Sequence, residues 1–227
     1  AQLATFFHVK TFSQKNKTIS VHNLGGISNL TLIEDQKVTQ AYDTGPANML
    51  LDMIVQKSTK NKKQFDQDGK LAKSGKINSK LFKKMAQHKY FTKKPPKSCG
   101  REQFGEIFYK KYKSELSKLT LADQLATMAE LVAYSIAANY KKFSLKNLSE
   151  IIFCGGGANN KFLISRIQNY LPEIKLSTTA DYGWPTQSIE AAAFALLAVA
   201  RLQNVEANLP ETTGAKRKGL LGKITQI

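Results

Sequence analysis

Apolar and polar residues alternate over three short segments near the start of the chain. These segments are 18–24, 29–34 and 37–43, and the turn residues Gly25-Gly26 and Asp35-Gln36 separate them. Alternation with a period of two, bounded by turn residues, is typical of half-buried strands joined by hairpins. The pattern therefore predicts a meander of three antiparallel strands.

After this meander, longer segments with helically spaced apolar residues alternate with short apolar runs. The spacing predicts helices over 48–56, 121–140, 159–169 and 189–203, and strands over 150–154 and 173–177. The resulting order, β-β-β-α-β-α-β-α, predicts an α/β protein with a mixed sheet and helices on both faces. One lobe of the hexokinase and actin-like (ribonuclease H-like) ATPases has this layout.

The segment 57–120 differs from its surroundings, because it is rich in lysine and contains only short helical runs such as 77–88. A Pro95-Pro96 pair interrupts it. We interpret it as a helical insertion packed against the sheet, so that 1–227 forms a single lobe.

The charge is strongly positive. The 227 residues include 34 Lys+Arg and 17 Asp+Glu, a formal net charge of +17. Dense lysine can neutralise phosphates, but base-specific readers rely on bidentate arginine, and only four of these basic residues are arginines. The composition therefore favours a solvated lysine surface over specific nucleic-acid recognition.

The sequence gives no support for a membrane protein, a secreted protein or a protein built on disulfides or zinc. We find neither the ~20 uncharged apolar residues of a membrane helix nor the basic start and apolar run of a signal peptide. Cys99 and Cys154 are far apart, with no second cysteine or histidine at ligand spacing, so a disulfide framework or zinc site is not indicated. We expect a cytoplasmic protein without a membrane partner.

Two glycine clusters are candidates for phosphate or nucleotide binding. Gly25-Gly26 lies at a predicted hairpin tip, where positive φ is allowed and backbone N–H groups can approach a phosphate; a plain hairpin turn explains the pair equally well. Gly155-Gly156-Gly157 lies between a predicted strand and a helix N-terminus, which favours an anion or a nucleotide. Its alternative is a tight strand-to-helix turn, and it lacks the lysine of a P-loop.

Two carboxylates are candidates for the accompanying chemistry. Asp43, at a predicted strand end beside Gly45, could hold a Mg²⁺-bound water, or it could cap the next helix. Glu190 opens the apolar run 191–195 and, on the residues alone, is more simply an ordinary glutamate of a first helical turn.

Taken together, a series of motifs resembles the anhydro-N-acetylmuramic acid kinase family. In order along the chain they are NLGGISNLT, YDTGPANMLLD, FDQDGKLAKSG, KYFTKKPPKSCGREQF, IIFCGGGANN, SIEAAAFALLAVARL and NLPETTGA. The resemblance implies ATP- and Mg²⁺-dependent phosphorylation of the 6-hydroxyl of 1,6-anhydro-N-acetylmuramic acid, while water opens the anhydro ring, in peptidoglycan recycling.

The resemblance also implies roles for individual residues. Gly25 and Gly26 match a phosphate loop, and Gly155, Gly156 and Gly157 match the adenosine loop. A further cleft loop near the phosphates is matched by Asp43, Thr44, Gly45 and Asn48. Glu190 matches a glutamate near the sugar and the attacking water, whereas Arg101 and Glu102 belong to a motif whose role we leave unassigned.

The chain also departs from the family pattern. Family members are longer and begin with a lobe that carries a glycine- and serine-rich phosphate loop and the general-base aspartate. Residues 1–8 resemble the family segment that follows that aspartate, and Ala47 replaces a usual glycine. We therefore expect a C-terminal lobe that is inactive alone and has a small amino sugar as its substrate.

Other interpretations remain open on the sequence. One is a separately encoded N-terminal lobe, which would complete the enzyme. Another is a non-catalytic lysine-rich remnant, or a nucleotide- or anion-binding module. A third is a sugar kinase of altered specificity, and the sequence leaves homodimerisation undecided.

Overall fold

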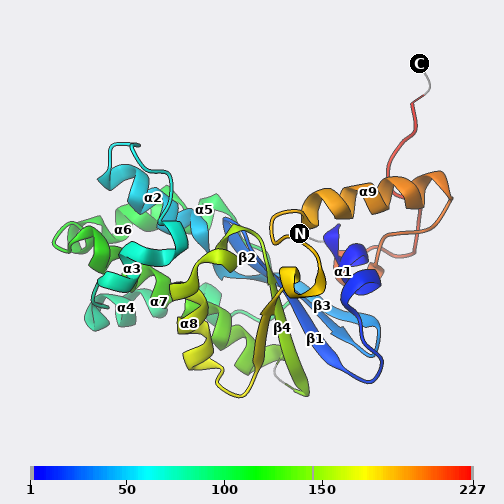
Figure 1. Cartoon of the computed structure of the whole chain (residues 1–227), viewed down its shortest axis with the longest axis horizontal. Coiled ribbons are helices and arrows are strands. Elements are labelled where there is room, and N and C mark those ends of the chain that lie inside the picture. Colours follow the sequence, from blue (N-terminus) through cyan, green and yellow to red (C-terminus); the bar gives the residue numbers. More distant parts are fainter. Residues whose placement is uncertain (1–2, 145, 226–227) are drawn as a thin grey trace.

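A five-stranded mixed sheet forms the centre of the computed structural model, which describes residues 3–144 and 146–225 (Figure 1). Ala1 and Gln2 of the N-terminal motif lie outside the described residues. The strands are β1 Thr18–Leu24, β2 Ile27–Glu34, β3 Lys37–Pro46, β4 Leu148–Cys154 and β5 Lys175–Thr178. Their order is β3-β2-β1-β4-β5, with β1–β2 and β2–β3 antiparallel and β1–β4 and β4–β5 parallel. The predicted meander and mixed sheet are confirmed.

Helices surround this sheet. The α-helices are α1 Ala4–Phe12, α2 Asn48–Ser58, α3 Lys70–Ser74, α4 Ser79–Ala86, α5 Arg101–Phe104, α6 Glu106–Leu116, α7 Leu121–Asn139, α8 Lys161–Tyr170, α9 Ile189–Leu202 and α10 Pro210–Thr213. Short 3₁₀ or π segments are η1 Gln67–Gly69, η2 Lys89–Thr92, η3 Tyr140–Ser144, η4 Gly156–Asn159 and η5 Thr179–Tyr182. No helix within the described ranges is long and apolar enough to cross a membrane.

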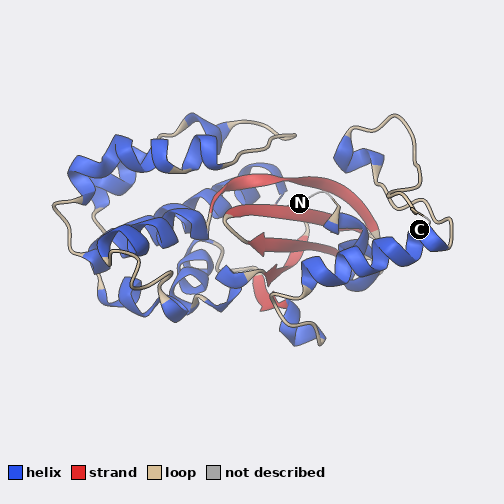
Figure 2. Cartoon of the chain, turned by 90° about the horizontal axis from the view of Figure 1, so that it is seen from above, coloured by secondary structure: helices blue, strands red, loops and turns tan. Residues whose placement is uncertain are grey.

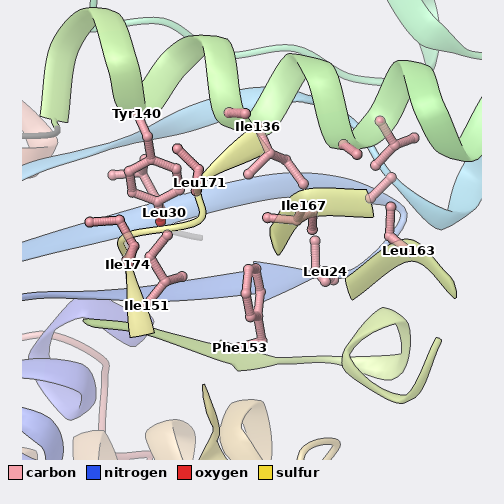
Figure 3. Close-up of a cluster of buried hydrophobic side chains, with 14 of the residues drawn as sticks. Leu24, Leu30, Ile136, Tyr140, Ile151, Phe153, Leu163, Ile167, Leu171 and Ile174 are labelled. Carbon is pink, nitrogen blue, oxygen red and sulfur yellow. The ribbon is translucent and has the colours of Figure 1, made fainter. Parts of the chain in front are cut away.

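Both faces of the sheet carry helices, as the alternation of side chains requires. On one face Ile151 and Phe153 of β4 pack against Ile136 of α7 and Leu163 and Ile167 of α8 (Figure 3). The other face is covered by α1 and α9, whose apolar side chains pack with residues of β1, β2 and β4. These contacts include Phe7, Phe12, Ile19, Val21, Ile33, Ile152, Ile189 and Ala193. Because side chains alternate along a strand, one residue pattern supplies two cores.

The segment 57–120 is helical and packs on the rest of the chain through a core of its own. In Figure 1 its helices gather at the left, around α7 and beside the sheet. Viewed from above, this helical group lies at one end of the sheet and α9 runs out beyond the other (Figure 2). The core contains Leu50, Phe91, Phe104, Phe108 and Met128, all nearly inaccessible to solvent. The helical character expected of this segment is therefore confirmed.

Some boundaries differ from the prediction. The third strand does not end at Asp43 but pairs with β2 as far as Pro46, which lies opposite Ile27. Since β3 is an edge strand, the missing N–H of a terminal proline costs no ladder hydrogen bond. Pro46 therefore ends the strand, and Ala47 follows it as the N-cap of α2. Helix α1 was not predicted, because its apolar residues lie on both faces of a short helix and therefore do not follow a helical period.

Candidate functional site

The two glycine clusters meet at one edge of the sheet. β1 and β4 are parallel neighbours, with Asn23 opposite Cys154, so their carboxyl ends lie side by side. Each strand then enters a glycine segment, 25–26 after β1 and 155–157 after β4. In open α/β sheets this edge is where ligands bind. Two segments about 130 residues apart in sequence thus form one candidate site.

A hollow of about 350 Å³ opens at this edge. Its polar lining includes Asn23, Gly25, Asn29, Gly155, Gly156, Thr186, Gln187 and Glu190. A second hollow of about 340 Å³ lies next to it, lined among others by Asn48, Asp52, Phe65, Gln67, Gly156, Gly157 and Asn160. Gly156 and Gln187 line both, so the glycine segment forms the boundary between them.

The three glycines of 155–157 have different local environments. Gly155 has φ 81° and ψ 173°, and a Cβ there would lie 2.4 Å from Asn23 Oδ1 and 2.8 Å from the carbonyl oxygen of Leu24. A Cβ on Gly157 would lie 2.7 Å from Leu24 Cβ. Gly156 is exposed, and a Cβ there would meet nothing closer than 3.8 Å. Gly155 and Gly157 are thus explained by packing, whereas Gly156 leaves its space open to the hollows.

Gly25 and Gly26 are not required by the shape of their turn. Neither has positive φ, contrary to the reason given for a hairpin tip, and a Cβ on either would meet nothing closer than 3.4 Å. Their carbonyl oxygens accept hydrogen bonds from backbone amides at the start of α2, including those of Asn48 and Met49. Since packing and φ do not account for these glycines, close approach of a ligand is the interpretation they favour.

Asn48, the first residue of α2, holds the Gly25-Gly26 turn in place through a hydrogen bond. Its side-chain Nδ2 donates to the carbonyl oxygen of Leu24 at 2.9 Å, and the residue lines the second hollow.

Ala47 is the N-cap of α2 and makes no side-chain cap. The alternative that Asp43 caps this helix is therefore wrong.

The N-terminus of α8 does not face the site as an open anion cradle. The 3₁₀ segment η4 separates Gly155 from α8, and the side chain of Asn160 accepts the amide of Leu163 at 3.0 Å. The helix that we expected to start at 159 therefore begins later and is already capped by the protein.

Thr44 and Gly45 lie inside the protein and line neither of these two hollows. The Thr44 hydroxyl lies 2.7 Å from Ser28 Oγ, which in turn lies 2.6 Å from His22 Nε2. The other ring nitrogen of His22 lies 2.8 Å from Tyr140 Oη. This chain of polar groups connects β3, β2, β1 and η3 beneath the Gly25-Gly26 turn. A direct ligand contact of Thr44 or Gly45 stays a prediction of the resemblance, and the structure gives both a packing role.

This arrangement predicts the effect of replacing Thr44. Thr44→Val keeps the shape but removes hydrogen bonds to Ser28, so we expect a loss of about 1–2 kcal/mol in the free energy of unfolding. Chemical denaturation measures it, with Thr44→Ser as the control that restores the hydroxyl. An unchanged stability in Thr44→Val would contradict the role of this chain of hydrogen bonds.

Asp43 lies away from the glycine segments, in a third hollow that also contains Asn29 and Lys97. Its Oδ2 accepts the amide of Cys99 at 3.0 Å, and its carbonyl oxygen accepts the Tyr90 hydroxyl at 2.7 Å. Burial raises the pKa of the Asp43 carboxyl, and the Cys99 amide opposes this effect. The Asp43 carboxylate holds the 97–99 segment in place. Asn29 lines both the first hollow and this third one, and so connects Asp43 to the main site.

The described residues contain no group of three or more His, Cys, Asp or Glu side chains placed to hold a metal ion. Mg²⁺ in nucleotide sites is usually held by one or two carboxylates together with the phosphates of the nucleotide. A magnesium role for Asp43 stays a prediction.

Glu190 is the second residue of α9 and lines the first hollow. It shares the lining of this hollow with Gln187 and with Gly25, Gly155 and Gly156. Arg101 and Glu102 begin α5, are exposed, and contact neither hollow.

Sequence reasoning missed several residues of the site. Asn23, Asn29, Asp52 and Gln187 line its hollows, and none of them was assigned a role. Burial raises the pKa of Asp52 to about 6. A signal was present for three of them, because Asn23 and Asn29 lie in the motif NLGGISNLT and Asp52 in YDTGPANMLLD, whereas Gln187 lies in none of the quoted motifs.

Comparison with known proteins shows a match along the whole chain. The sequence pattern of the family described as anhydro-N-acetylmuramic acid kinase matches residues 1–227. The chain is 42% identical over 211 residues to the anhydro-N-acetylmuramic acid kinase of Synechococcus elongatus, covering 90% of this chain and 56% of that relative. It is 35% identical over 232 residues to that of Caldanaerobacter subterraneus subsp. tengcongensis, covering 99% of this chain and 59% of the relative. The chain thus spans a little over half the length of these relatives.

A solved structure has the same fold. It is the activator of the 2-hydroxyisocaproyl-CoA dehydratase from Clostridium difficile with bound ADPNP, at a TM-score of 0.51 and 13% identity, covering 89% of this chain and 68% of that one. At this identity the likeness shows the fold alone. The actin-like ATPase fold predicted from the order of strands and helices is confirmed.

Proposed function

Because the chain belongs to the anhydro-N-acetylmuramic acid kinase family, we propose that it forms the nucleotide-binding lobe of such a kinase. The reaction would transfer the γ-phosphate of ATP to the 6-hydroxyl of 1,6-anhydro-N-acetylmuramic acid while water opens the anhydro ring. The product would be N-acetylmuramic acid 6-phosphate. The observation that carries the proposal is the convergence of Gly25 from one glycine segment and Gly155 and Gly156 from the other on one hollow, with Gly156 open to it.

In this proposal the nucleotide lies across Gly156. The phosphates occupy the first hollow, where the backbone of Gly25 and Gly156 can approach them without a Cβ between. The adenosine occupies the second hollow, where the ring of Phe65 is 58% exposed and offers a stacking surface. Phosphoryl transfer depends mainly on such positioning and on electrostatic stabilisation.

The carboxylate of Glu190 supplies the polar wall on the sugar side of the first hollow. Its proposed role is to orient the water that opens the anhydro ring. Mg²⁺, when bound with ATP, would neutralise phosphate charge, and Asp43 would reach it only through water. The general-base aspartate would come from a second lobe, so we propose that this chain binds ATP but does not turn over alone.

Replacing Gly156 tests this arrangement. Gly156→Ala should leave the free energy of unfolding within about 1 kcal/mol, because glycine-to-alanine replacements at unstrained positions are mild and the new Cβ meets nothing closer than 3.8 Å. The methyl group would occupy the space between the two hollows, and we expect at least a tenfold loss of MgATP affinity in isothermal titration, about 1.4 kcal/mol.

The control is Gly219→Ala, at a glycine without positive φ that has nothing within 4 Å of its added Cβ and lines neither hollow. It should keep MgATP affinity. Tripolyphosphate, titrated in parallel at two salt concentrations, separates a nucleotide site from a lysine-rich anion binder. If MgATP and tripolyphosphate bind with equal affinity, and Gly156→Ala changes neither affinity, the proposal is overturned and a non-catalytic anion-binding module is favoured.

A further inference from the structure

The second hollow contains a carboxylate that the protein leaves without a partner. Three aspartates line this hollow, namely Asp52, Asp66 and Asp68. The carboxylate oxygens of Asp66 accept two backbone amides of α3, each at 2.9 Å, and Asp68 Oδ2 lies 3.4 Å from Lys70 Nζ. Among the described residues no donor or cation is bound to the Asp52 carboxylate, and burial is the one cause that shifts its pKa. Asp52 is therefore available to accept hydrogen bonds from a ligand.

The surroundings of Asp52 make an unpaired charge costly. The side chain is half-buried, and burial raises the pKa of its carboxyl to about 6. At pH 7.5 the group is mostly ionised, but it lacks the hydrogen-bond donors that usually accompany a buried charge. Ionisable groups in this state are concentrated at functional sites. A ligand that brings donors to Asp52 recovers this free energy on binding.

Helix α2 places Asp52 close to the glycine segments. Asn48 begins this helix, and its backbone amide donates to the carbonyl oxygen of Gly25 at 3.0 Å. The Asn48 side chain lies 3.8 Å from the position that a Cβ on Gly156 would take, so this end of α2 borders the boundary between the two hollows. Asp52 follows four residues later, on the same face of the helix and about 6 Å further along its axis. Asp52 therefore lines the second hollow just beyond the proposed phosphates.

The ribose is the part of a nucleotide that suits this position. It joins the phosphates to the base, so a nucleotide with its phosphates at Gly156 and its base on Phe65 has its ribose in the second hollow. The 2′- and 3′-hydroxyls are neighbouring donors, and a carboxylate offers two acceptor oxygens. An acidic side chain on a ribose hydroxyl is also the arrangement found in dinucleotide-binding folds. The adenine edge fits less well, because its ring nitrogens are acceptors that an ionised carboxylate repels.

We propose that Asp52 recognises the ribose of the nucleotide by accepting hydrogen bonds from its 2′- and 3′-hydroxyls, an inference that rests on the proposed function. The site thereby selects ribonucleotides over deoxyribonucleotides as phosphate donors. Asp66 and Asp68 do not replace Asp52 in this role, because their carboxylates are already bound within the protein. The selection depends on the charge of Asp52, since a hydrogen bond to a charged acceptor is stronger than one to a neutral acceptor.

Removing the carboxylate and removing the ribose hydroxyls should therefore have linked effects. Isothermal titration of the full 227-residue chain compares MgATP with the magnesium complex of 2′,3′-dideoxyATP. We expect the wild type to bind the dideoxy nucleotide about tenfold more weakly than ATP. In Asp52→Ala the ratio of the two affinities should fall to about one, because the partner of the hydroxyls is gone.

Two further variants accompany this comparison. Glu173→Gln removes one charge from an exposed residue that lines neither hollow, and it should keep the wild-type ratio. Asp52→Asn keeps the shape of the side chain and a neutral acceptor, and it should give an intermediate ratio. Asp52→Ala should remain folded, because no contact of the carboxylate is lost and alanine favours the helix.

Two results would overturn the proposal. One is equal affinity of the wild type for ATP and 2′,3′-dideoxyATP, and the other is an affinity ratio that Asp52→Ala and Asp52→Asn leave unchanged. A parallel loss of both nucleotides in Asp52→Ala, at the wild-type ratio, would assign the carboxylate to the base. If the wild type binds MgATP, these results remove only the inference about the ribose. If it does not bind MgATP, the proposed function fails and this inference fails with it.

Discussion

Lowering the pH from 7.5 to 5.0 is expected to remove about 4 kcal/mol from the free energy of unfolding through two buried histidines, a loss that proton uptake by Asp52 in the folded protein offsets in part. The cause is a pair of histidines, His8 on α1 and His22 on β1, which are 2% and 0% exposed. Burial lowers the pKa of each from its ordinary 6.5 to about 3. In the folded protein both are therefore neutral throughout this range.

The sign follows from proton uptake. Between about pH 3 and 6.5 these two histidines bind more protons in the unfolded chain than in the folded one, so their contribution to stability falls as the pH drops below 6.5. At pH 5 each histidine lowers the free energy of unfolding by about 2 kcal/mol. The loss arises from protonation in the unfolded state and needs no change in the native contacts of either ring.

Denaturant unfolding at several pH values measures this effect, with His22→Gln as the comparison. Removing one titrating group should lower the slope of stability against pH near pH 5 by about 1.4 kcal/mol per pH unit. Equal slopes in wild type and His22→Gln would contradict a neutral, buried His22. Comparing slopes is necessary because carboxyl groups also begin to titrate near pH 5.

Replacing Gly155 is expected to cost about 4 kcal/mol of stability. Its backbone, at φ 81° and ψ 173°, lies in a region essentially confined to glycine, where another residue costs about 1–3 kcal/mol. The Cβ of Gly155→Ala would in addition lie 2.8 Å from the carbonyl oxygen of Leu24, and such overpacking costs about 1–3 kcal/mol more. The neighbouring Gly156→Ala should be nearly neutral.

Thermal or chemical unfolding of the two alanine variants tests this difference within one loop. The expected order is a large loss for Gly155→Ala and a change within about 1 kcal/mol for Gly156→Ala. Equal losses would contradict the distinction drawn between the packing glycine and the open one. Gly157→Ala, whose Cβ would meet Leu24 Cβ at 2.7 Å but whose φ is not positive, should lose only the overpacking part, about 1–3 kcal/mol.

Much of the fold follows from local patterns in the sequence. Period-two alternation in 18–24 and 37–43 and helical spacing in 121–140 are strong signals, and these elements appear near the expected residues. The extension of β3 to Pro46 escaped prediction, because strand ends depend on pairing with Ile27, which is remote in sequence. Helix α1 escaped it because both of its sides are covered.

The site was predictable only in part. Glycine clusters at 25–26 and 155–157 point to close backbone approach from the sequence alone, and the structure brings them together. The sequence does not distinguish Gly155 from Gly156, because the difference lies in contacts with Leu24 and Asn23 from another strand. Thr44 likewise reads as a loop residue, and its burial depends on Ser28 and His22 of neighbouring strands.

A nucleotide that binds where the two glycine segments meet should change the environment of the glycine amides there. The 14 glycines provide reporters in a [¹⁵N]glycine-labelled amide spectrum recorded with and without MgATP. We expect shifts at Gly25, Gly155, Gly156 and Gly157, which line the hollows, and none at Gly214, Gly219 and Gly222, which line neither. An unchanged spectrum at millimolar MgATP, or shifts confined to the second group, would contradict nucleotide binding there.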